Sequence, residues 1–578
     1  MIYTSPPLSS HQRRKVLDLI EEWQKQLDAT RTLFTLSLIM LETGIFDERI
    51  EKFLSLAEKK QDRNPDSPTY GNLTYYLDSD KIVDLNSVEF CMRDGLLIWI
   101  RHCDKLSIKA KEILKRLLSY GIEGIKRHNV KVYYTNIFLL KTWNLIGSGE
   151  SFGQQDIAEE GYKQLDNWIE WTEKNGIREY SSPNYYHVDI TGLGLIYNYT
   201  KNTEAKKDAE KCLKLFWTDL GANFFRAAGR IGGPRSRDYD YIYGKNGVDS
   251  LLKYYNWIKR ENGYIPDYLV ALSEWKPPES IKRLNRTYPR FIERKIAPPE
   301  GEWACHYTGR KISIGCHSFA YSPLDKVLAF FFADEKIPNG YVVFDGRNDP
   351  YGKKPEKNPW SGNEHRVHLH LVPFITAYQN KNEIVMYSMM KASDPTLPRI
   401  APNLSGFYTH FVFPKAEVYI DGKKVRFSKG EKISLRINEP VVIKRGSVAV
   451  GIKIFHASNM QKVEPQMFLV DDGLYGVARI TVVHSDTKVD DGKADIGFYM
   501  VAAENVKNAE IFSERVKRKR FHLVYQSDTV EIVERSKKMK TVLRFNPEKG
   551  EKIVQKKIDA VLSINGKDIG RKILEKGG

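Results

Sequence analysis

The hydrophobic pattern of this chain changes its period near residue 276, and that change limits the folds the chain can adopt. Before it, apolar residues recur every three to four positions, as in residues 11–28, which is typical of amphipathic helices. After it, short apolar stretches such as 416–420 end at turn pairs, here Asp421-Gly422, a pattern typical of antiparallel strands. We therefore predict an α+β protein, helical first and β second.

The helical half contains at least nine periodic segments, and they are of two kinds. Some, such as residues 136–143, are apolar on every side, whereas others, such as 110–118, are amphipathic and basic. An alternation of buried and half-exposed helices is expected when helices form two concentric layers. The predicted helices cover residues 11–28, 33–41, 50–57, 88–103, 108–125, 132–146, 157–172, 188–199 and 205–220, with two more near 248–258 and 266–275.

The domain boundaries follow from length and from a proline-rich segment. A chain of 578 residues exceeds the size at which one hydrophobic core keeps growing, so two or more domains are expected. Residues 276–301 contain five prolines among basic residues, a composition typical of a linker. We predict a helical domain over 1–275, a linker over 276–301 and an antiparallel β-sandwich over 302–578.

The charge balance favours an acidic partner. Lys and Arg number 90 against 73 Asp and Glu, a formal charge of +17, which suits nucleic acid, anionic lipid or anionic polysaccharide, unless the charge is simply spread over a large surface. The basic tract 515–520 lies between predicted strands and is expected to be solvated surface. Because no nucleic-acid-binding motif accompanies it, no nucleic acid partner is predicted.

Compartment and assembly are constrained less strongly. The most apolar short stretch, 33–41, is too brief to cross a bilayer, so no membrane association is expected. The first ten residues are polar and do not read as a signal peptide. Five cysteines, an odd number, fit a reducing compartment. A cytoplasmic location is therefore expected for the chain as given, and a secreted one if a leader has been removed; a homo-oligomer is compatible with the sequence.

A polar motif between two predicted helices, residues 179–189, has the sequence Glu-Tyr-Ser-Ser-Pro-Asn-Tyr-Tyr-His-Val-Asp. Pro183 forces the residue before it out of the helical region, so a helix should start just after it. The polar side chains would then lie at a helix N-terminus, where backbone amides and the helix dipole favour an anion. Capping that helix needs only one of them.

A second polar motif, residues 232–241, has the sequence Gly-Gly-Pro-Arg-Ser-Arg-Asp-Tyr-Asp-Tyr and is predicted to be a loop. Arginine recognises a carboxylate through a two-pronged contact, and tyrosine can stack on a sugar or transfer a proton. The alternative is a loop held together by its own Arg–Asp pairs, since the charges nearly balance within it.

The two motifs together resemble a known family. A helical half with Glu-Tyr-x-Ser-Pro-x-Tyr and a following His, then a Gly-Pro-x-Ser-Arg-x-Tyr loop and a large β domain, resembles the heparinase II/III-like and alginate-lyase-like polysaccharide lyases. The resemblance implies an incomplete (α/α) toroid joined to an antiparallel β-sandwich. It also implies β-elimination on an acidic oligosaccharide or polysaccharide that contains uronic acid, with no cofactor required.

That reaction requires neutralisation of the uronate carboxylate, a base for the C5 proton and an acid for the departing oxygen. The resemblance implies Asn184 and Arg237 as neutralisers. It implies His187 as the base or a partner to it, and Tyr239 as the base or the acid. Asn184 as a helix cap and His187 as a packing residue are the alternatives.

Further residues are expected to bind the substrate. Tyr186 and Tyr241 are alternatives to Tyr239 as the catalytic tyrosine. His306 and Arg310 are expected to reach the cleft from the β domain. His317 and the histidine-rich segment 365–370 are alternatives for that last position. The predicted substrate-binding residues are Tyr180, Tyr186, Asp189, Arg235, Asp238, Tyr241, His306 and Arg310.

Two other functions remain open. A glycoside hydrolase on the same scaffold would pair Glu179 or Asp189 with Asp238 or Asp240 as acid and base. A non-catalytic glycan-binding protein would use the aromatic residues only for stacking, and would have no turnover for a Tyr239 variant to lose.

A structural zinc site is a separate prediction. His368 and His370 would share one face of a strand and could both reach a cation. Cys305-His306 and Cys316-His317 form a second set of soft ligands on a predicted hairpin. Neither set has the close spacing of an established zinc motif, so ordinary strand histidines are the alternative.

Overall fold

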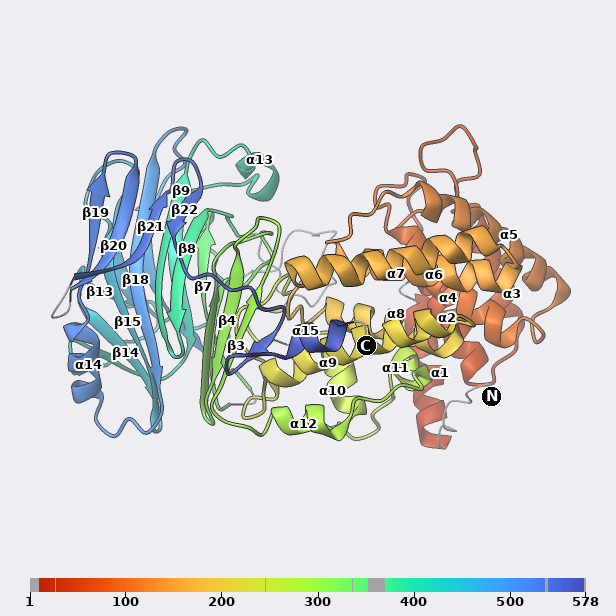
Figure 1. Cartoon of the computed structure of the whole chain (residues 1–578), viewed down its shortest axis with the longest axis horizontal. Helices are drawn as coiled ribbons and strands as arrows, with labels where there is room; N and C mark the ends of the chain where they lie inside the picture. The colour runs from red at the N-terminus through yellow and green to blue at the C-terminus, as the bar shows by residue number, and fades with distance from the viewer. Residues whose placement is uncertain are drawn as a thin grey trace.

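The computed structural model describes residues 10–575 except 26, 245, 335, 352–369 and 536–538. A helical N-terminal part lies at one end of the molecule and a stack of β-sheets at the other (Figure 1), as the change of period predicts. Within the described residues, none of the helices combines the length and apolarity that a bilayer crossing requires.

Eight helices form two layers of an incomplete (α/α) toroid. The inner helices contact one another in the order α2–α4–α6–α8, and each is followed in the chain by an outer helix. The predicted architecture is therefore confirmed. The inner helices are α2 (Thr30–Glu42), α4 (Ser87–His102), α6 (Thr135–Phe152) and α8 (Tyr185–Tyr199), and the outer helices are α3 (Glu48–Lys59), α5 (Ile108–Arg127), α7 (Gln155–Asn175) and α9 (Thr203–Asn223).

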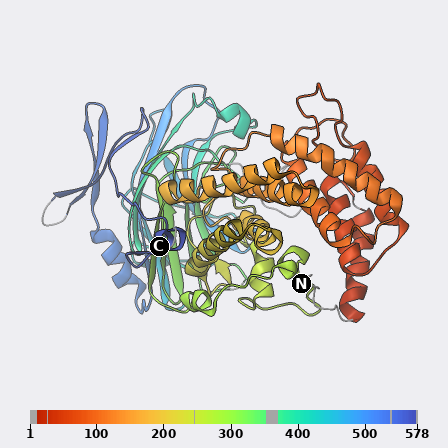
Figure 2. The same ribbon diagram turned by 45° about the vertical axis from the view of Figure 1, so that its right-hand side comes forward.

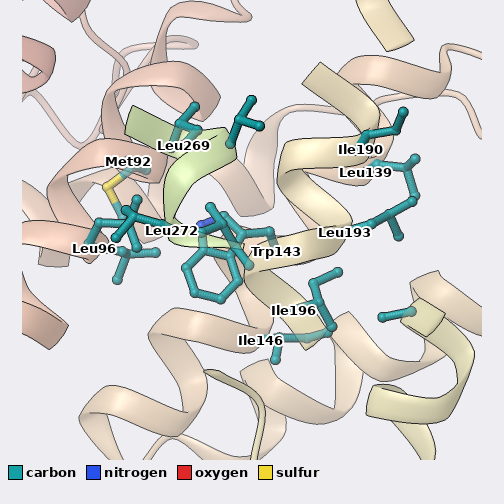
Figure 3. Close-up of a cluster of buried hydrophobic side chains, with 14 of the residues drawn as sticks. Met92, Leu96, Leu139, Trp143, Ile146, Ile190, Leu193, Ile196, Leu269 and Leu272 are labelled. Carbon is teal, nitrogen blue, oxygen red and sulfur yellow. The ribbon is translucent and has the colours of Figure 1, made fainter. Parts of the chain in front are cut away.

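The apolar surface of each helix explains its layer. Residues 135–149 of α6 are all buried, and α8 is apolar on most sides, as expected for helices surrounded by others. In contrast, α5 buries one stripe and exposes lysines on the other side. The short helix α11 (Tyr268–Leu272) adds Leu269 and Leu272 to the core that the inner helices build (Figure 3).

Smaller elements surround this ring. Helix α1 (Ser10–Lys25) packs through Val16 and Ile20, and its Gln12 side chain donates to the carbonyl oxygen of Tyr264. The remaining short elements of this half are β1 (Phe224–Phe225), β2 (Arg230–Ile231), α10 (Val248–Tyr254) and α12 (Glu279–Leu284).

The β part consists of three stacked antiparallel sheets. The large sheet has the order β13-β16-β17-β10-β7-β6-β5-β4-β3-β23-β24, and the middle sheet has the order β12-β11-β14-β15-β18-β9-β8. Phe330, Phe411 and Phe498 lie in the buried core between these two sheets, which form the predicted sandwich.

The strands of the large sheet are β3 (Arg290–Lys295), β4 (Trp303–Thr308), β5 (Ile312–His317), β6 (Leu328–Phe332), β7 (Asn339–Asp345), β10 (Phe407–Pro414), β13 (Lys432–Ser434), β16 (Gln466–Val470), β17 (Val477–Ser485), β23 (Ser563–Ile564) and β24 (Lys567–Asp568). Those of the middle sheet are β8 (Phe374–Asn380), β9 (Glu383–Lys391), β11 (Glu417–Ile420), β12 (Lys423–Val425), β14 (Pro440–Arg445), β15 (Val448–Ala457) and β18 (Lys493–Ala503). The short helix α13 (Leu397–Ile400) lies between β9 and β10 in the chain.

The third sheet has four strands and lies on the side of the sandwich away from the helices (Figure 2). Its strands are β19 (Phe521–Gln526), β20 (Thr529–Arg535), β21 (Met539–Asn546) and β22 (Glu551–Val554). The basic tract 515–520 lies between strands β18 and β19, as predicted, and includes the C-terminal end of helix α14 (Ala509–Arg518). Positive side chains at that end of a helix are favoured by its dipole.

The predicted linker, residues 276–301, is structured. It contains α12 and the sheet strand β3, so the chain enters the β part without a free connection. The chain also returns at its C-terminal end, where β23 pairs with β3 and α15 (Ile569–Leu574) packs on α7 and α9. The β part therefore supplies an element of the helical part.

Candidate active site

Arg237 joins the two polar motifs at the border between the ring and the large sheet. Its Nη2 donates to Tyr185 Oη at 3.1 Å and to Tyr239 Oη at 3.4 Å, and the two phenol oxygens lie 2.7 Å apart. Its Nη1 donates to Glu179 at 3.1 Å. Its guanidinium carbon lies 4.4 Å from the centre of the Tyr185 ring. We call Arg237, Tyr185, Tyr239 and Glu179 the Arg237 cluster.

The first turn of α8 positions Tyr185. The helix begins there, directly after Pro183 and Asn184, as predicted. The Ser182 hydroxyl accepts from the backbone N–H of Tyr185 at 3.1 Å, whereas Asn184 makes no cap bond with its side chain. The side-chain amide of Asn184 therefore does not cap the N-terminus of α8.

The loop between β5 and β6 positions Arg237. The Arg237 backbone N–H donates to Asp325 Oδ1 at 3.1 Å, and the next N–H donates to the carbonyl oxygen of Leu324 at 3.0 Å. Arg237 has φ of 48°, a left-handed conformation that is unusual for a residue other than glycine and persists only where its surroundings enforce it. The β part thus fixes the backbone that carries the guanidinium.

Burial and charge set the protonation of the Arg237 cluster. Burial raises the pKa of Tyr185 well above its usual range, although the Arg237 cation opposes that rise. Burial also raises the pKa of Glu179, again against the effect of Arg237. Burial alone would lower the pKa of Arg237, but Tyr185, Tyr239 and Glu179 raise it well above its usual range. The cluster therefore holds a permanent cation beside protonated Tyr185.

His187 faces a different part of the molecule from Tyr185. Residues two apart on an α-helix point in nearly opposite directions, and His187 Nε2 lies 3.2 Å from Asp267 Oδ2. Burial raises the pKa of Asp267, but the effect of His187 is to lower it, and the net pKa is below the usual value. The pair lines a cleft of about 870 Å³ between α1, α2, α10 and α11, which we call the α1 cleft.

Two of the predicted substrate-binding residues, Tyr180 and Tyr186, are packed into the protein interior. Tyr186 is buried and donates to Asp219 at 2.5 Å, and Asp219 pairs with Arg294 of β3 at 2.5 Å. Tyr180 stacks on His317 with ring centres 4.7 Å apart. These contacts join the ring of helices to the large sheet. Substrate binding by Tyr180 and Tyr186 stays a prediction, and their contacts do not favour it.

His306 likewise lies in the interface rather than above a cleft. Its Nδ1 lies 3.0 Å from Asn223 Oδ1 and its Nε2 lies 3.2 Å from Thr308 Oγ1. Burial lowers its pKa well below the usual value. A neutral imidazole with both nitrogens engaged is suited to packing.

Asp238, Arg235 and Lys326 form a buried ionic triad. Asp238 Oδ2 lies 3.2 Å from Arg235 Nη2 and 2.8 Å from Lys326 Nζ, and all three side chains are fully buried. Burial and Arg235 lower the pKa of Lys326 to about 8, and Asp238 opposes that fall. The predicted alternative, a loop held together by its own Arg–Asp pairs, therefore describes Arg235 and Asp238. Because Asp238 is buried and paired, it is poorly placed to act as the acid or base of a glycoside hydrolase.

Asp189 and Tyr241 are also enclosed. The Tyr241 hydroxyl donates to the carbonyl oxygen of Asp325 at 3.2 Å. Asp189 is fully buried, and neither of its oxygens has a hydrogen-bond partner among the described residues. Burial, with a smaller effect of Glu179, raises its pKa well above the usual range.

This placement of Asp189 gives a prediction for stability against pH. The folded protein keeps a proton that the unfolded chain releases above about pH 3.9, so the free energy of unfolding should fall as pH rises above that value. Asp189→Asn removes this dependence. We expect the variant to exceed the wild type in stability at alkaline pH, by about 1.4 kcal/mol for each unit by which the pKa is raised. Denaturant unfolding at several pH values measures the difference, and parallel curves for the two proteins would contradict the prediction.

Arg310 and the histidines of the predicted metal site do not join the Arg237 cluster through any described contact. Arg310 is exposed in the β4–β5 turn, over the Tyr288 ring. His370 packs edge-on against Tyr241, and His368 lies outside the described residues. No set of three or more His, Cys, Asp or Glu side chains in the described ranges could hold a metal ion, and the zinc site stays a prediction.

Two members of the arrangement, Tyr185 and Asp267, are not among the predicted site residues. Tyr186 was predicted in the place that Tyr185 takes, although adjacent residues of a helix point in different directions and Tyr186 is the one buried in the core. Asp267 was not singled out, although Asp followed by an apolar run signals the start of a helix. Its Oδ1 accepts from the Leu269 and Val270 backbone N–H groups of α11.

Comparison with known proteins gives one family and several solved structures. A family described as a domain of unknown function, DUF8769, matches residues 56–269, which include both polar motifs. No curated protein matches the chain. The structure is similar to the Streptomyces coelicolor A3 chondroitin AC lyase, with 8% identity, a TM-score of 0.47, and coverage of 91% of this chain and 84% of that one.

It is also similar to heparinase III, with 10% identity, a TM-score of 0.40, and coverage of 92% and 81%. A third similar structure is Paenibacillus xanthan lyase, with 9% identity, a TM-score of 0.40, and coverage of 87% and 56%. These TM-scores lie below 0.5, so the activity of this chain must be inferred from its own side chains.

Proposed function

We propose that the protein is a glycan lyase that cleaves an anionic, uronic-acid-containing oligosaccharide or polysaccharide by β-elimination. The observation that carries this proposal is the pair of phenol oxygens 2.7 Å apart, both bonded to one guanidinium. Elimination needs a base and an acid near the same sugar ring. Two phenols that share a proton beside a fixed cation can provide both.

The proton transfers balance within this pair. With one phenol ionised, the phenolate takes the proton from C5 of the uronate while the other phenol gives its proton to the departing glycosidic oxygen at C4. The C4–O bond breaks and a C4–C5 double bond forms. A proton then crosses the 2.7 Å contact and restores the starting state. Arg237 lowers the free energy of the phenolate throughout.

The uronate carboxylate also needs a partner, because its charge opposes formation of the carbanion-like transition state. We assign that role to Asn184, which precedes Tyr185 and has no cap bond to α8. The backbone amides at the start of α8 add to the same effect. Arg237 acts mainly on the phenols, since both of its terminal nitrogens already have partners.

The test is to incubate the protein with a panel of uronic-acid oligosaccharides and follow the ultraviolet absorbance of the unsaturated uronate product. Tyr239→Phe should lower kcat by about 100-fold or more, as expected for loss of an acid–base group. Tyr525→Phe, which changes an exposed tyrosine of β19, is the matched control. New reducing ends without the absorbance would show hydrolysis instead and reject the proposal.

The pair also predicts the pH dependence. One phenol must ionise before catalysis, and burial raises the pKa of Tyr185, so kcat/KM should rise with pH through neutrality. The apparent pKa belongs to the pair of tyrosines rather than to one of them. A pH–rate profile that falls above neutral pH would contradict phenol ionisation as the activating step.

A further inference from the structure

We infer that the α1 cleft binds an uncharged pyranose ring, and thus that the substrate joins its uronate to a neutral sugar. That this neutral sugar is the neighbour of a uronate rests on the proposed lyase function, whereas the binding of a neutral sugar in the cleft does not. The cleft holds about 870 Å³, a volume within the range of small-molecule sites.

The two walls of the cleft differ in chemistry. On one wall, α1 and α2 present Leu19, Trp23 and Ile39, and Trp23 is 41% exposed although it lies on the apolar stripe of α1. The opposite wall carries polar side chains from α8 and α10, including His187 and Ser250. A pyranose matches this arrangement, because its C–H face packs on an aromatic ring while its hydroxyls bond at the edge.

The charges of the cleft argue against an anionic ring. The charged side chains of its lining, besides His187, are the carboxylates Glu42, Asp249 and Asp267 and the cations Arg13 and Lys253. Lys253 pairs with Glu261 at 2.6 Å. Glu42 and Asp267 are paired as well, with Arg101 at 2.5 Å and with His187 at 3.2 Å. The lining therefore offers no surplus of positive charge to a uronate or sulfate. The Arg237 cluster, in contrast, presents a buried cation.

The cleft and the Arg237 cluster lie on different faces of the same turn of α8. Tyr185 and His187 are two residues apart, so their Cα atoms are separated by less than about 7.6 Å. Asn246 also connects the two places, because it lines the cleft and its Nδ2 donates at 3.2 Å to Asp238, the residue between Arg237 and Tyr239. The Oδ1 atom of Asn246 is buried with no described partner, which leaves an acceptor for a hydroxyl.

The experiment is isothermal titration calorimetry of the full chain with neutral gluco-, galacto- and manno-oligosaccharides of three or four residues. For the oligosaccharide that the wild type binds, Trp23→Ala should raise the Kd by about tenfold, as expected for loss of one stacking ring. Phe46→Ala, another exposed aromatic residue of the helical part that does not line the cleft, should leave the affinity unchanged.

A second variant guards against loss of α1 packing. Ser250→Trp fills the cleft from α10 and should abolish binding without touching α1. If neither variant changes the affinity, or if only uronate oligosaccharides bind, the inference is wrong. These outcomes do not depend on turnover, so binding of a neutral sugar by a protein that leaves every uronic-acid oligosaccharide of the absorbance panel intact would reject the lyase proposal and leave the cleft assignment standing.

Discussion

Replacing Arg237 with lysine is expected to lower kcat by about 10²–10³-fold, as found when one preorganised donor is removed from an active site. Lysine keeps the charge but is a point donor, and it cannot bond Glu179, Tyr185 and Tyr239 in the fixed fork that the guanidinium provides. Initial rates of product absorbance measure the effect.

Arg116→Lys is the matched control, since Arg116 is a surface arginine of α5 paired with Glu58. Thermal unfolding of both variants separates a catalytic effect from a loss of folding. An Arg237→Lys enzyme with turnover near that of the wild type would show that the phenols do not need the guanidinium geometry. That result would contradict the proposed mechanism.

Replacing Asp238 with alanine is expected to cost about 3–5 kcal/mol of unfolding free energy, the usual effect of breaking a buried ionic pair. The side chain is the shared partner of Arg235 and Lys326, which are fully buried. Without it, two cations remain in a dry interface. Lys326, whose pKa is already about 8, should then release its proton more readily.

Chemical denaturation followed by circular dichroism measures this loss. Glu48→Ala removes one partner of the exposed Lys52 pair on α3 and should cost at most about 0.5 kcal/mol. Equal losses for the two variants would mean that the triad relaxes or admits water, and that its charges are not held in a dry interior.

The fold could be predicted to a large extent because the period at which apolar residues recur is a local property of the sequence. The all-round apolar pattern of residues 136–143 placed α6 in the inner layer, and Pro183 placed the start of α8. The predicted linker differed because prolines mark a break in helices without excluding a strand. Arg290–Lys295 carries an alternating pattern of burial within the same proline-rich stretch.

The candidate site could be predicted only in outline. The two motifs were found, and Arg237 and Tyr239 do meet the 179–189 segment, but which tyrosine they meet depends on the rotation of α8. His187 illustrates the same limit, because Tyr185, two positions earlier, faces Arg237 while the His187 ring faces Asp267. Roles that depend on which face of a helix is covered require the packing partner, here α11 and the β5–β6 loop.

The return of the chain after β22 has a consequence for biosynthesis. Val561, Leu562 and Leu574 are buried in the core of the helical part, and Ser563–Ile564 adds a strand beside β3. During translation the ring emerges first and can begin to fold, but α7 and α9 keep an apolar surface uncovered until residues 561–574 have left the ribosome. A prematurely terminated chain would expose that surface, which makes it a substrate for chaperones and proteases and gives the cell a means to remove incomplete copies.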